Sequence, residues 1–555
     1  MSAITQGERA TRERTVAADP APSFHASRSD RFVPLLVLFS CFAYLCIFLR
    51  YSTLEPDEGI VLQGAERILA GQVPYRDFFS FYTPGSFYLI AGLFRVFGDS
   101  FAVARISLAA TGAMSSLFTY ALARRVCSRN VALFAAMLAT TAGAAFRFLV
   151  LHNPYSTLGC CACLYAFIRW SETRKPIWAF TAGSLASLTF LLEQSKGGGL
   201  FLGLVLALVI LRVCDREFRL GRVALIASTI GVFWPMALTF AYFAANHAMG
   251  QMFQCWLWPL QHYTQANHVA YGHQNWSDRT RELIFYTGPV WMRLVKSLIV
   301  LPGLLIPVLP LIAVGLLVYW SIQLFCRDTS TDARYYVVVC SVVTGLLVSI
   351  VIVRPDLLHF MYLAPLWYLV LAWFFDPLST RSSTLRRLHD PLIAFVWITF
   401  GLLSMAVLLA TTGANNRVET RRGRITTGAP DTVIQYAQQH VPPHSKMLVY
   451  PYLPLYNYLS ATLSPSRYEY FQPGMNTNEQ ALEIIASLQS SNAPVLFEPA
   501  FAEKIANSWP QTSLKAIIDD PVSDYIVRHY RICQRLRSPE GEQLEFMVKR
   551  ERPCS

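Results

Sequence analysis

The chain has 555 residues, of which 54% are hydrophobic and only 15% are charged. This balance excludes an ordinary water-soluble protein, whose surface needs more charge. The formal net charge of +12 lies largely in short loops between apolar runs, so it indicates membrane topology and not nucleic-acid binding.

Residues 1–32 form a polar, Arg-rich tail, which we predict to be disordered and cytoplasmic. Apolar runs then recur over residues 33–411, each near the length that spans a bilayer as a helix. We predict about eleven spans, at roughly residues 33–51, 100–123, 131–146, 155–170, 178–192, 199–211, 223–245, 296–320, 335–353, 361–376 and 391–411. Every second loop is basic, so residues 52–99 become the first outer loop. The short apolar segment 87–97 within it suits an interfacial or re-entrant helix.

Two acids, Asp57 and Glu58, follow the first span directly. Carboxylates at the mouth of a membrane bundle are costly unless they are solvated or paired, so their position calls for a reason. One reason is structural, because Pro56 and the acids favour the first turn of a helix over 59–69. Helix-start acids can also line a cavity, so the structural and the functional interpretation are compatible.

The predicted topology gathers further polar side chains on the outer side of the membrane. They are Arg76, Asp77, His152, Asn153, Glu193, Lys196, Arg354, Asp356 and His359. Acids and cations at one membrane depth suit a substrate with an anionic head and a reacting hydroxyl or amine, such as a lipid-linked phosphosugar. Asp77 is a candidate ligand of the acceptor or of a metal ion, and Arg76 is a candidate substrate ligand.

In such a reaction a carboxylate takes the proton of the acceptor, and cations neutralise the departing phosphate. We predict Asp57 as the general base and Glu58 as its helper. Lys196, Arg354 and His359 are the candidate phosphate ligands. The alternative for the Lys and the Arg is that they extend to the membrane interface, and for the His that it is a satisfied polar residue.

The outer segment 246–295 is rich in Trp, Tyr and His, which indicates either an interfacial aromatic belt or side chains that stack on a sugar or lipid. Residues 412–555 change character and predict a water-soluble α/β domain outside the membrane. Its predicted strands are 447–450, 495–497 and 544–548, and its predicted helices are 479–488 and 521–536. Cys533 and Cys554 lie in this domain, where a disulfide is allowed, but the sequence does not decide whether they pair.

Several segments together resemble the bacterial GT-C membrane glycosyltransferases, the group of the protein O-mannosyltransferases, the lipid A aminoarabinose transferases and the RgtA/B/C/D-like enzymes. They are Glu55-Pro56-Asp57-Glu58-Gly59, 65–71, Pro74-Tyr75-Arg76-Asp77-Phe78-Phe79, Tyr82-Thr83-Pro84-Gly85 and Arg354-Pro355-Asp356 with His359. The resemblance implies a GT-C-like α-helical polytopic fold, Asp57 as the catalytic carboxylate and Tyr82 in the substrate site.

The resemblance further implies a polyprenyl-phosphate-linked sugar as donor, an extracytoplasmic lipid, glycan or protein as acceptor, and a place in the bacterial inner membrane. Some relatives use a divalent cation and others do not, so the resemblance assigns no metal ligand. A Lys-Gln element of the family is rearranged here as Glu193-Gln194-Ser195-Lys196, which weakens the role carried over to Lys196.

Two other classes fit part of the sequence. A transporter or flippase of lipid-linked glycans would explain many spans with buried charges, but not the large soluble domain. A noncatalytic scaffold that binds glycans would explain the soluble domain, but not the acids of the first loop. The sequence names neither the sugar nor the acceptor.

Overall fold

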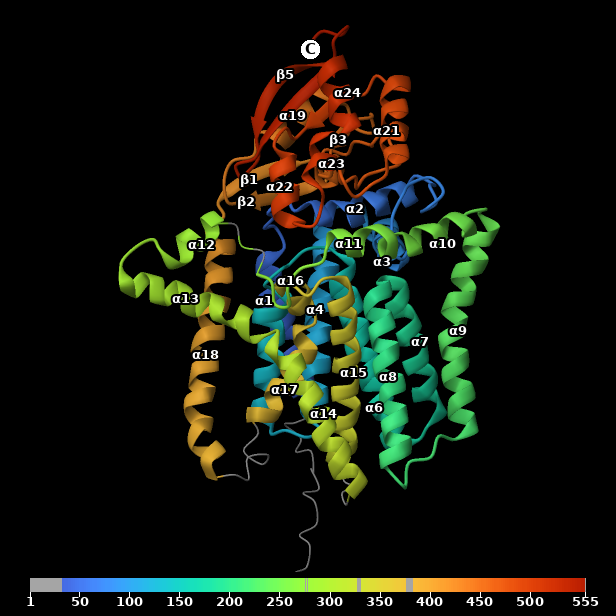
Figure 1. Ribbon diagram of the computed structural model, residues 1–555, viewed down its shortest axis with the longest axis vertical. Helices are drawn as coiled ribbons and strands as arrows, with labels where there is room; N and C mark the ends of the chain where they lie inside the picture. Colours follow the sequence, from blue (N-terminus) through green and yellow to red (C-terminus); the bar gives the residue numbers. More distant parts are fainter. Residues whose placement is uncertain (1–31, 275, 277, 327–330, 376–382, 555) are drawn as a thin grey trace, which may run out of the picture.

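A bundle of apolar helices forms one half of the molecule, and a domain of strands and short helices covers one end of it (Figure 1). This computed structural model describes residues 32–554 apart from 275, 277, 327–330 and 376–382, so the predicted N-terminal tail lies almost wholly outside the described residues. The helices of the bundle are α1 (Val33–Leu45), α4 (Phe101–Ala123), α5 (Arg129–Ala139), α6 (His152–Thr173), α7 (Pro176–Leu192), α8 (Gln194–Cys214), α9 (Arg222–Ala245), α13 (Val290–Leu305), α14 (Val308–Cys326), α15 (Thr331–Val353), α17 (Ala364–Phe375) and α18 (Ser383–Thr412).

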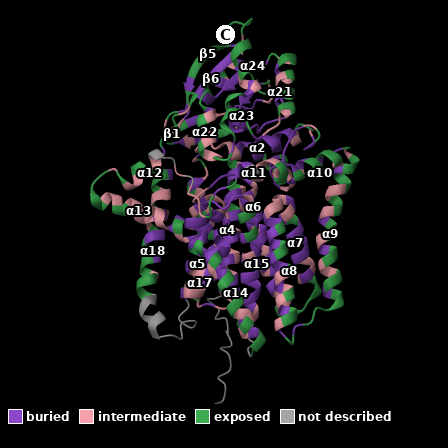
Figure 2. Ribbon diagram, viewed as in Figure 1, coloured by how far each residue is buried: buried purple, intermediate pink, exposed green. Residues whose placement is uncertain are grey.

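The predicted apolar runs all fall on helices, so the prediction of a polytopic helical membrane protein is confirmed. Six of the described helical segments are long and apolar enough to cross a membrane. The predicted span 155–170 lies on α6, which has 22 residues, and the remaining predicted spans correspond to shorter helices. The run predicted at 296–320 is divided between α13 and α14 at Pro307, because proline lacks a backbone N–H and disfavours helix at the residue before it. The peripheral helices α9 and α18 expose apolar side chains, as lipid-facing helices do (Figure 2).

Glycines bring α8 and α15 into close contact inside the bundle. A Cβ atom on Gly345 of α15 would collide with the backbone of Gly199 and Gly203 of α8. Small residues allow such an approach between membrane helices, where dispersion contacts replace the hydrophobic effect. This close packing fixes the position of α8 relative to α15.

Short helices lie between the bundle and the upper domain. They are α2 (Pro56–Leu69), α3 (Gly85–Phe97), α10 (Met249–Trp258), α11 (Thr264–Ala266), α12 (Asp278–Phe285) and α16 (Leu357–Tyr362). The 13 residues of α3 are too few to cross a bilayer, in agreement with the prediction for 87–97.

The upper domain packs against α2 and forms ion pairs with it. Gly59 lies against the backbone of Leu455, and Arg67 forms a buried ion pair of 2.8 Å with Glu469. Arg422 also pairs with Glu66. Asp57 stands in the first turn of this helix, so the upper domain fixes the helix that carries it.

The upper domain contains a four-stranded sheet in the order β3-β4-β6-β5. The strands of this sheet are β3 (Leu448–Tyr450), β4 (Val495–Phe497), β5 (Tyr530–Arg537) and β6 (Gln543–Lys549). A separate hairpin consists of β1 (Asn416–Thr420) and β2 (Gly423–Thr427). The helices of the domain are α19 (Val433–His440), α20 (Pro454–Leu459), α21 (Asn478–Ser490), α22 (Phe501–Ser508), α23 (Leu514–Ile518) and α24 (Pro521–His529). Strands β3 and β4 are parallel, whereas β6 is antiparallel to both β4 and β5. The predicted α/β class is confirmed.

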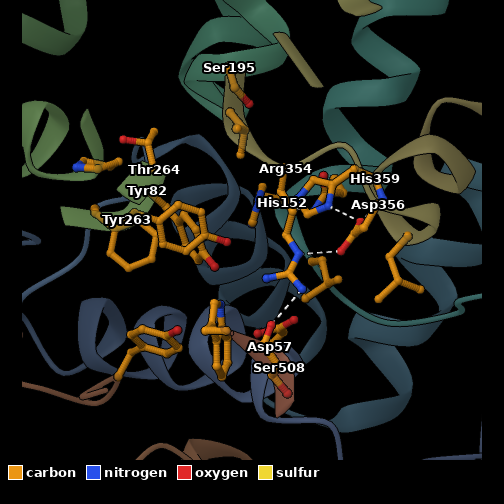
Figure 3. Close-up of a pocket in the computed structure, with 18 of the residues that line it drawn as sticks. Asp57, Tyr82, His152, Ser195, Tyr263, Thr264, Arg354, Asp356, His359 and Ser508 are labelled. Carbon is orange, nitrogen blue, oxygen red and sulfur yellow. Dashed lines mark hydrogen bonds and ion pairs between the residues drawn. The ribbon is translucent and has the colours of Figure 1, made fainter. Parts of the chain in front are cut away.

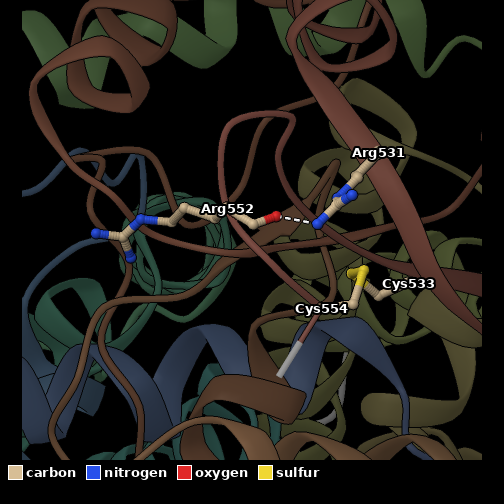
Figure 4. Close-up of a disulfide and its surroundings, with 4 residues drawn as sticks. All are labelled: Arg531, Cys533, Arg552 and Cys554. Atoms are coloured by element: carbon tan, nitrogen blue, oxygen red, sulfur yellow. Dashed lines mark hydrogen bonds between the residues drawn. A yellow bond between two sulfur atoms is a disulfide. The ribbon is translucent and has the colours of Figure 1, made fainter.

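The helix predicted over 521–536 is wrong in its second half. The helix ends at His529, and Tyr530–Arg537 forms β5, whose residues pair with β6 from Tyr530↔Lys549 to Arg537↔Gln543. The backbone hydrogen bonds of that partner override the local helical pattern. Cys533 of β5 and Cys554 form a disulfide that joins the strand to the C-terminal end of the chain (Figure 4).

Candidate active site

A cavity of about 1460 Å³ lies between the bundle and the upper domain. Side chains from α2, α6, α8, α15 and α16 form its membrane side, and residues that follow strands of the upper domain form the opposite wall. The cavity combines charged groups with an apolar flank, which is the usual composition of a ligand site.

Asp57 and Glu55 share one guanidinium group inside this cavity. Asp57 Oδ2 lies 3.1 Å from Arg147 Nη2, and Glu55 Oε2 lies 3.4 Å from the same nitrogen. The Asp57 side chain is 43% exposed, whereas that of Arg147 is 15% exposed. Asp57 is therefore both accessible to a ligand and held beside a cation.

Arg147 is the functional candidate that sequence reasoning missed. It follows the predicted span 131–146 directly and lies before α6, so its charge sits at the same membrane edge as the acids of the first loop. A cation just beyond an apolar run was the signal that could have identified it.

Arg354, Asp356 and His359 form a second charged cluster in the cavity (Figure 3). Arg354 Nε lies 2.6 Å from one carboxylate oxygen of Asp356, and His359 Nδ1 lies 2.6 Å from the other. Arg354 also donates to the Ser508 carbonyl of the upper domain at 2.8 Å. Asp356 caps the first turn of α16, so one carboxylate orients both the guanidinium and the imidazole.

Lys196 is buried below the cavity wall and does not line it. Its Nζ donates to Asn153 Oδ1 at 2.5 Å and lies 3.0 Å from Glu193 Oε2. Glu193, His152 and Asn153 do line the cavity, and the ring of Tyr82 lies 4.1 Å from that of His152. The Lys196 charge is thus already balanced within the protein.

Glu58, Arg76 and Asp77 also lie away from the cavity. Glu58 is fully buried, pairs with Arg105 at 2.7 Å and accepts the backbone N–H of Val150 at 2.9 Å. Arg76 and Asp77 pair with each other at the exposed end of the first loop, where Asp77 also accepts the N–H of Val73 at 2.7 Å.

Of the residues predicted for the site, the structure therefore brings Asp57, Tyr82, Arg354 and His359 together around the cavity. It places Glu58, Arg76, Asp77 and Lys196 outside the lining. Within the described part of the chain, no three His, Cys, Asp or Glu side chains are grouped as metal ligands. In the cavity, both Glu55 and Asp57 face Arg147.

Apolar side chains form one flank of the cavity at the level of the bundle. They are Phe190, Leu202, Phe253, Leu257, Leu260, Val348 and Ile352, from α7, α8, α10 and the segment after it, and α15. Leu202, Leu257 and Ile352 are each about half exposed, at 46%, 55% and 59%. This flank is apolar enough to contact a hydrocarbon chain beside the charged part of the cavity.

Comparison with known proteins shows a similar fold and a family match over part of the chain. Residues 82–236 match the model of the dolichyl-phosphate-mannose-protein mannosyltransferase family. ArnT from Cupriavidus metallidurans, solved bound to undecaprenyl phosphate, has a similar structure, with a TM-score of 0.52 and 13% identity over 93% of this chain and 96% of that chain. The apo oligosaccharyltransferase from Archaeoglobus fulgidus has a TM-score of 0.52 and 14% identity over 94% of this chain and 75% of that chain. A search of curated protein sequences gave no match.

Proposed function

We propose that this chain is a membrane glycosyltransferase of the GT-C type, which moves a sugar from a polyprenyl-phosphate donor to an acceptor outside the cytoplasm. The match of residues 82–236 to the mannosyltransferase family and the ArnT-like fold support this proposal. The observation that carries the proposal is the cavity itself, in which an apolar flank lies beside Asp57 and a set of cations. A polyprenyl-phosphate sugar has this distribution of properties, with a hydrocarbon tail, an anionic phosphate and a polar sugar.

In the proposed reaction, Asp57 accepts the proton of an acceptor hydroxyl or amine. The acceptor oxygen or nitrogen forms a bond to C1 of the sugar, and the bond between C1 and the phosphate oxygen breaks. Attack opposite the leaving group inverts the anomeric centre. Polyprenyl phosphate departs with the bonding electrons, and Arg147, Arg354 and His359 stabilise its charge.

The proposed role of Arg147 gives a prediction about the leaving group alone. In Arg147→Met, the affinity for undecaprenyl phosphate should fall roughly 10- to 100-fold, because a hydrogen bond to a charged group contributes about 1.5–3 kcal/mol. Arg76→Met is the matched control, since Arg76 is exposed and lies outside the cavity. Titration of each detergent-solubilised full-length variant with undecaprenyl phosphate measures its affinity. Equal affinities of Arg147→Met and Arg76→Met would show that Arg147 does not bind the phosphate.

We propose that the N-terminus lies in the cytoplasm and the upper domain outside the plasma membrane of a bacterium, an orientation that the basic loops support. A reporter enzyme that requires an oxidising compartment, fused after Ser555, should therefore be active. The same reporter fused before Met1 is the control and should be inactive. An active fusion before Met1 together with an inactive fusion after Ser555 would mean that the cavity faces the cytoplasm, which would contradict the proposed location.

To test the function, a panel of labelled undecaprenyl-phosphate sugars is added, together with cell-envelope extract, to membranes that contain the chain. One of the sugars should move into the extract while undecaprenyl phosphate accumulates in equal amount. Donor movement across sealed vesicles without cleavage would instead identify a flippase.

A further inference from the structure

Two strand ends of the upper domain contribute to the wall of the cavity opposite the bundle. Tyr452 lies two residues after β3, and Glu498 follows β4 directly; both line the cavity. Because β3 and β4 are parallel, their carboxyl ends open to the same side. In open α/β sheets this edge is where ligands bind, and here it faces the cavity that contains Asp57.

Two buried polar atoms at this edge have no hydrogen-bond partner among the described residues. They are Tyr452 Oη and Glu498 Oε2, in residues that are each only 2% exposed. A buried donor or acceptor without a partner is costly, so each such group calls for an explanation. Hydroxyl groups of a bound ligand can satisfy both the phenol and the carboxyl oxygen.

Lys504 of α22 holds the carboxyl groups of this wall in place. Its Nζ lies 2.5 Å from Glu542 Oε1 and 3.6 Å from Glu498 Oε1, and 5.9 Å from the centre of the Tyr452 ring. Burial raises the pKa of Glu498 to about 7, while Lys504 opposes that rise. Near neutral pH the Glu498 carboxyl group can thus either donate or accept a hydrogen bond.

The charge of this wall selects against a phosphate. Glu498, Glu540 and Glu542 line the cavity here, and Lys504 is already paired with two of them. Glu55 and Asp57 add negative charge that acts on Tyr452 from the bundle side. The rings of Tyr470 and Trp509 lie 5.7 and 6.0 Å from the ring of Tyr452, and such aromatic faces suit the apolar face of a sugar.

We infer that Tyr452, Glu498 and Lys504 form the acceptor subsite, which binds a hydroxyl-rich, phosphate-free group and presents it to Asp57. This inference rests on the proposed function. It separates the two substrates by charge, with the donor phosphate on the cationic side at Arg147 and Arg354 and the acceptor on the carboxylate side.

The test uses membranes that contain the full chain. The acceptor is supplied as envelope extract from cells that lack the chain, because such cells accumulate the unmodified acceptor. In Tyr452→Phe and Glu498→Gln, the amount of extract that gives half-maximal transfer should rise at least about tenfold, as expected for the loss of a hydrogen bond to a charged or buried group. The maximal rate should fall by less than that factor. Glu479→Gln, on the exposed face of α21, is the control.

Two further measurements make the result decisive. Binding of undecaprenyl phosphate should remain intact in both variants, which shows that the cavity is folded. Treatment of the extract with phosphatase should leave transfer unchanged. Unchanged half-saturation in both variants, or transfer that stops after phosphatase treatment, would overturn the subsite while leaving the proposed function in place. If the unaltered chain transfers no sugar, both the proposed function and the acceptor subsite are contradicted.

Discussion

Replacement of Asp57 by Asn should lower the rate of sugar transfer by about 10²- to 10⁴-fold, the range that a positioned general base contributes. Asn has nearly the same shape but cannot accept the proton of the acceptor. The Asp57 side chain is 43% exposed, and Arg147 keeps Glu55 as a partner, so the variant should still fold. The rate is measured in membranes with a labelled undecaprenyl-phosphate sugar at a saturating amount of envelope extract.

Asp77→Asn is the matched control for this experiment. Asp77 is a carboxylate of the same loop, but it pairs with Arg76 outside the cavity. Its replacement should leave the rate within about threefold, a change of less than 1 kcal/mol in the barrier. Equal losses in the two variants would mean that the loop, and not a base at Asp57, supports the reaction.

Replacement of Glu58 by Gln should lower the free energy of unfolding by about 3–5 kcal/mol, the usual cost of removing one partner of a buried ion pair. Glu58 and Arg105 are 0% and 1% exposed, so the arginine charge would remain in the protein interior without its counter-charge. Thermal denaturation of the detergent-solubilised full chain measures the loss.

The double variant Glu58→Leu with Arg105→Met is the control for Glu58, because replacing both charges by apolar side chains is often close to neutral. It should recover most of the stability lost in Glu58→Gln. A Glu58→Gln chain that keeps full stability and yet transfers no sugar would instead support the helper role that the sequence suggested.

The membrane architecture was predictable because apolar runs of spanning length have few alternative structures in a bilayer. The position of Asp57 followed from the same pattern, and the resemblance to GT-C glycosyltransferases was confirmed by the family match and by the fold. Strands β3, β4 and β6 were predicted close to their observed bounds. The segment 530–536 was predicted wrongly because its strand conformation depends on β6, which a local pattern does not contain.

The partners of the site residues were harder to predict than the residues themselves. Arg105 lies inside a predicted span, and its charge could have indicated that an acid is buried beside it, which is Glu58. No local pattern connects Asp57 with Tyr452 or Glu498, since they are separated by about four hundred residues. They line the same cavity only because the upper domain packs over the bundle.

The most direct test of the account is mass spectrometry of cell-envelope glycans from three otherwise identical cell lines. One carries the unaltered chain, one lacks it, and one carries Asp57→Asn at the same membrane level. We predict one sugar substituent that is present with the unaltered chain and missing from the other two. Identical envelope glycans in all three lines would contradict transfer by this chain, and a sugar that persists with Asp57→Asn would contradict the base at its centre.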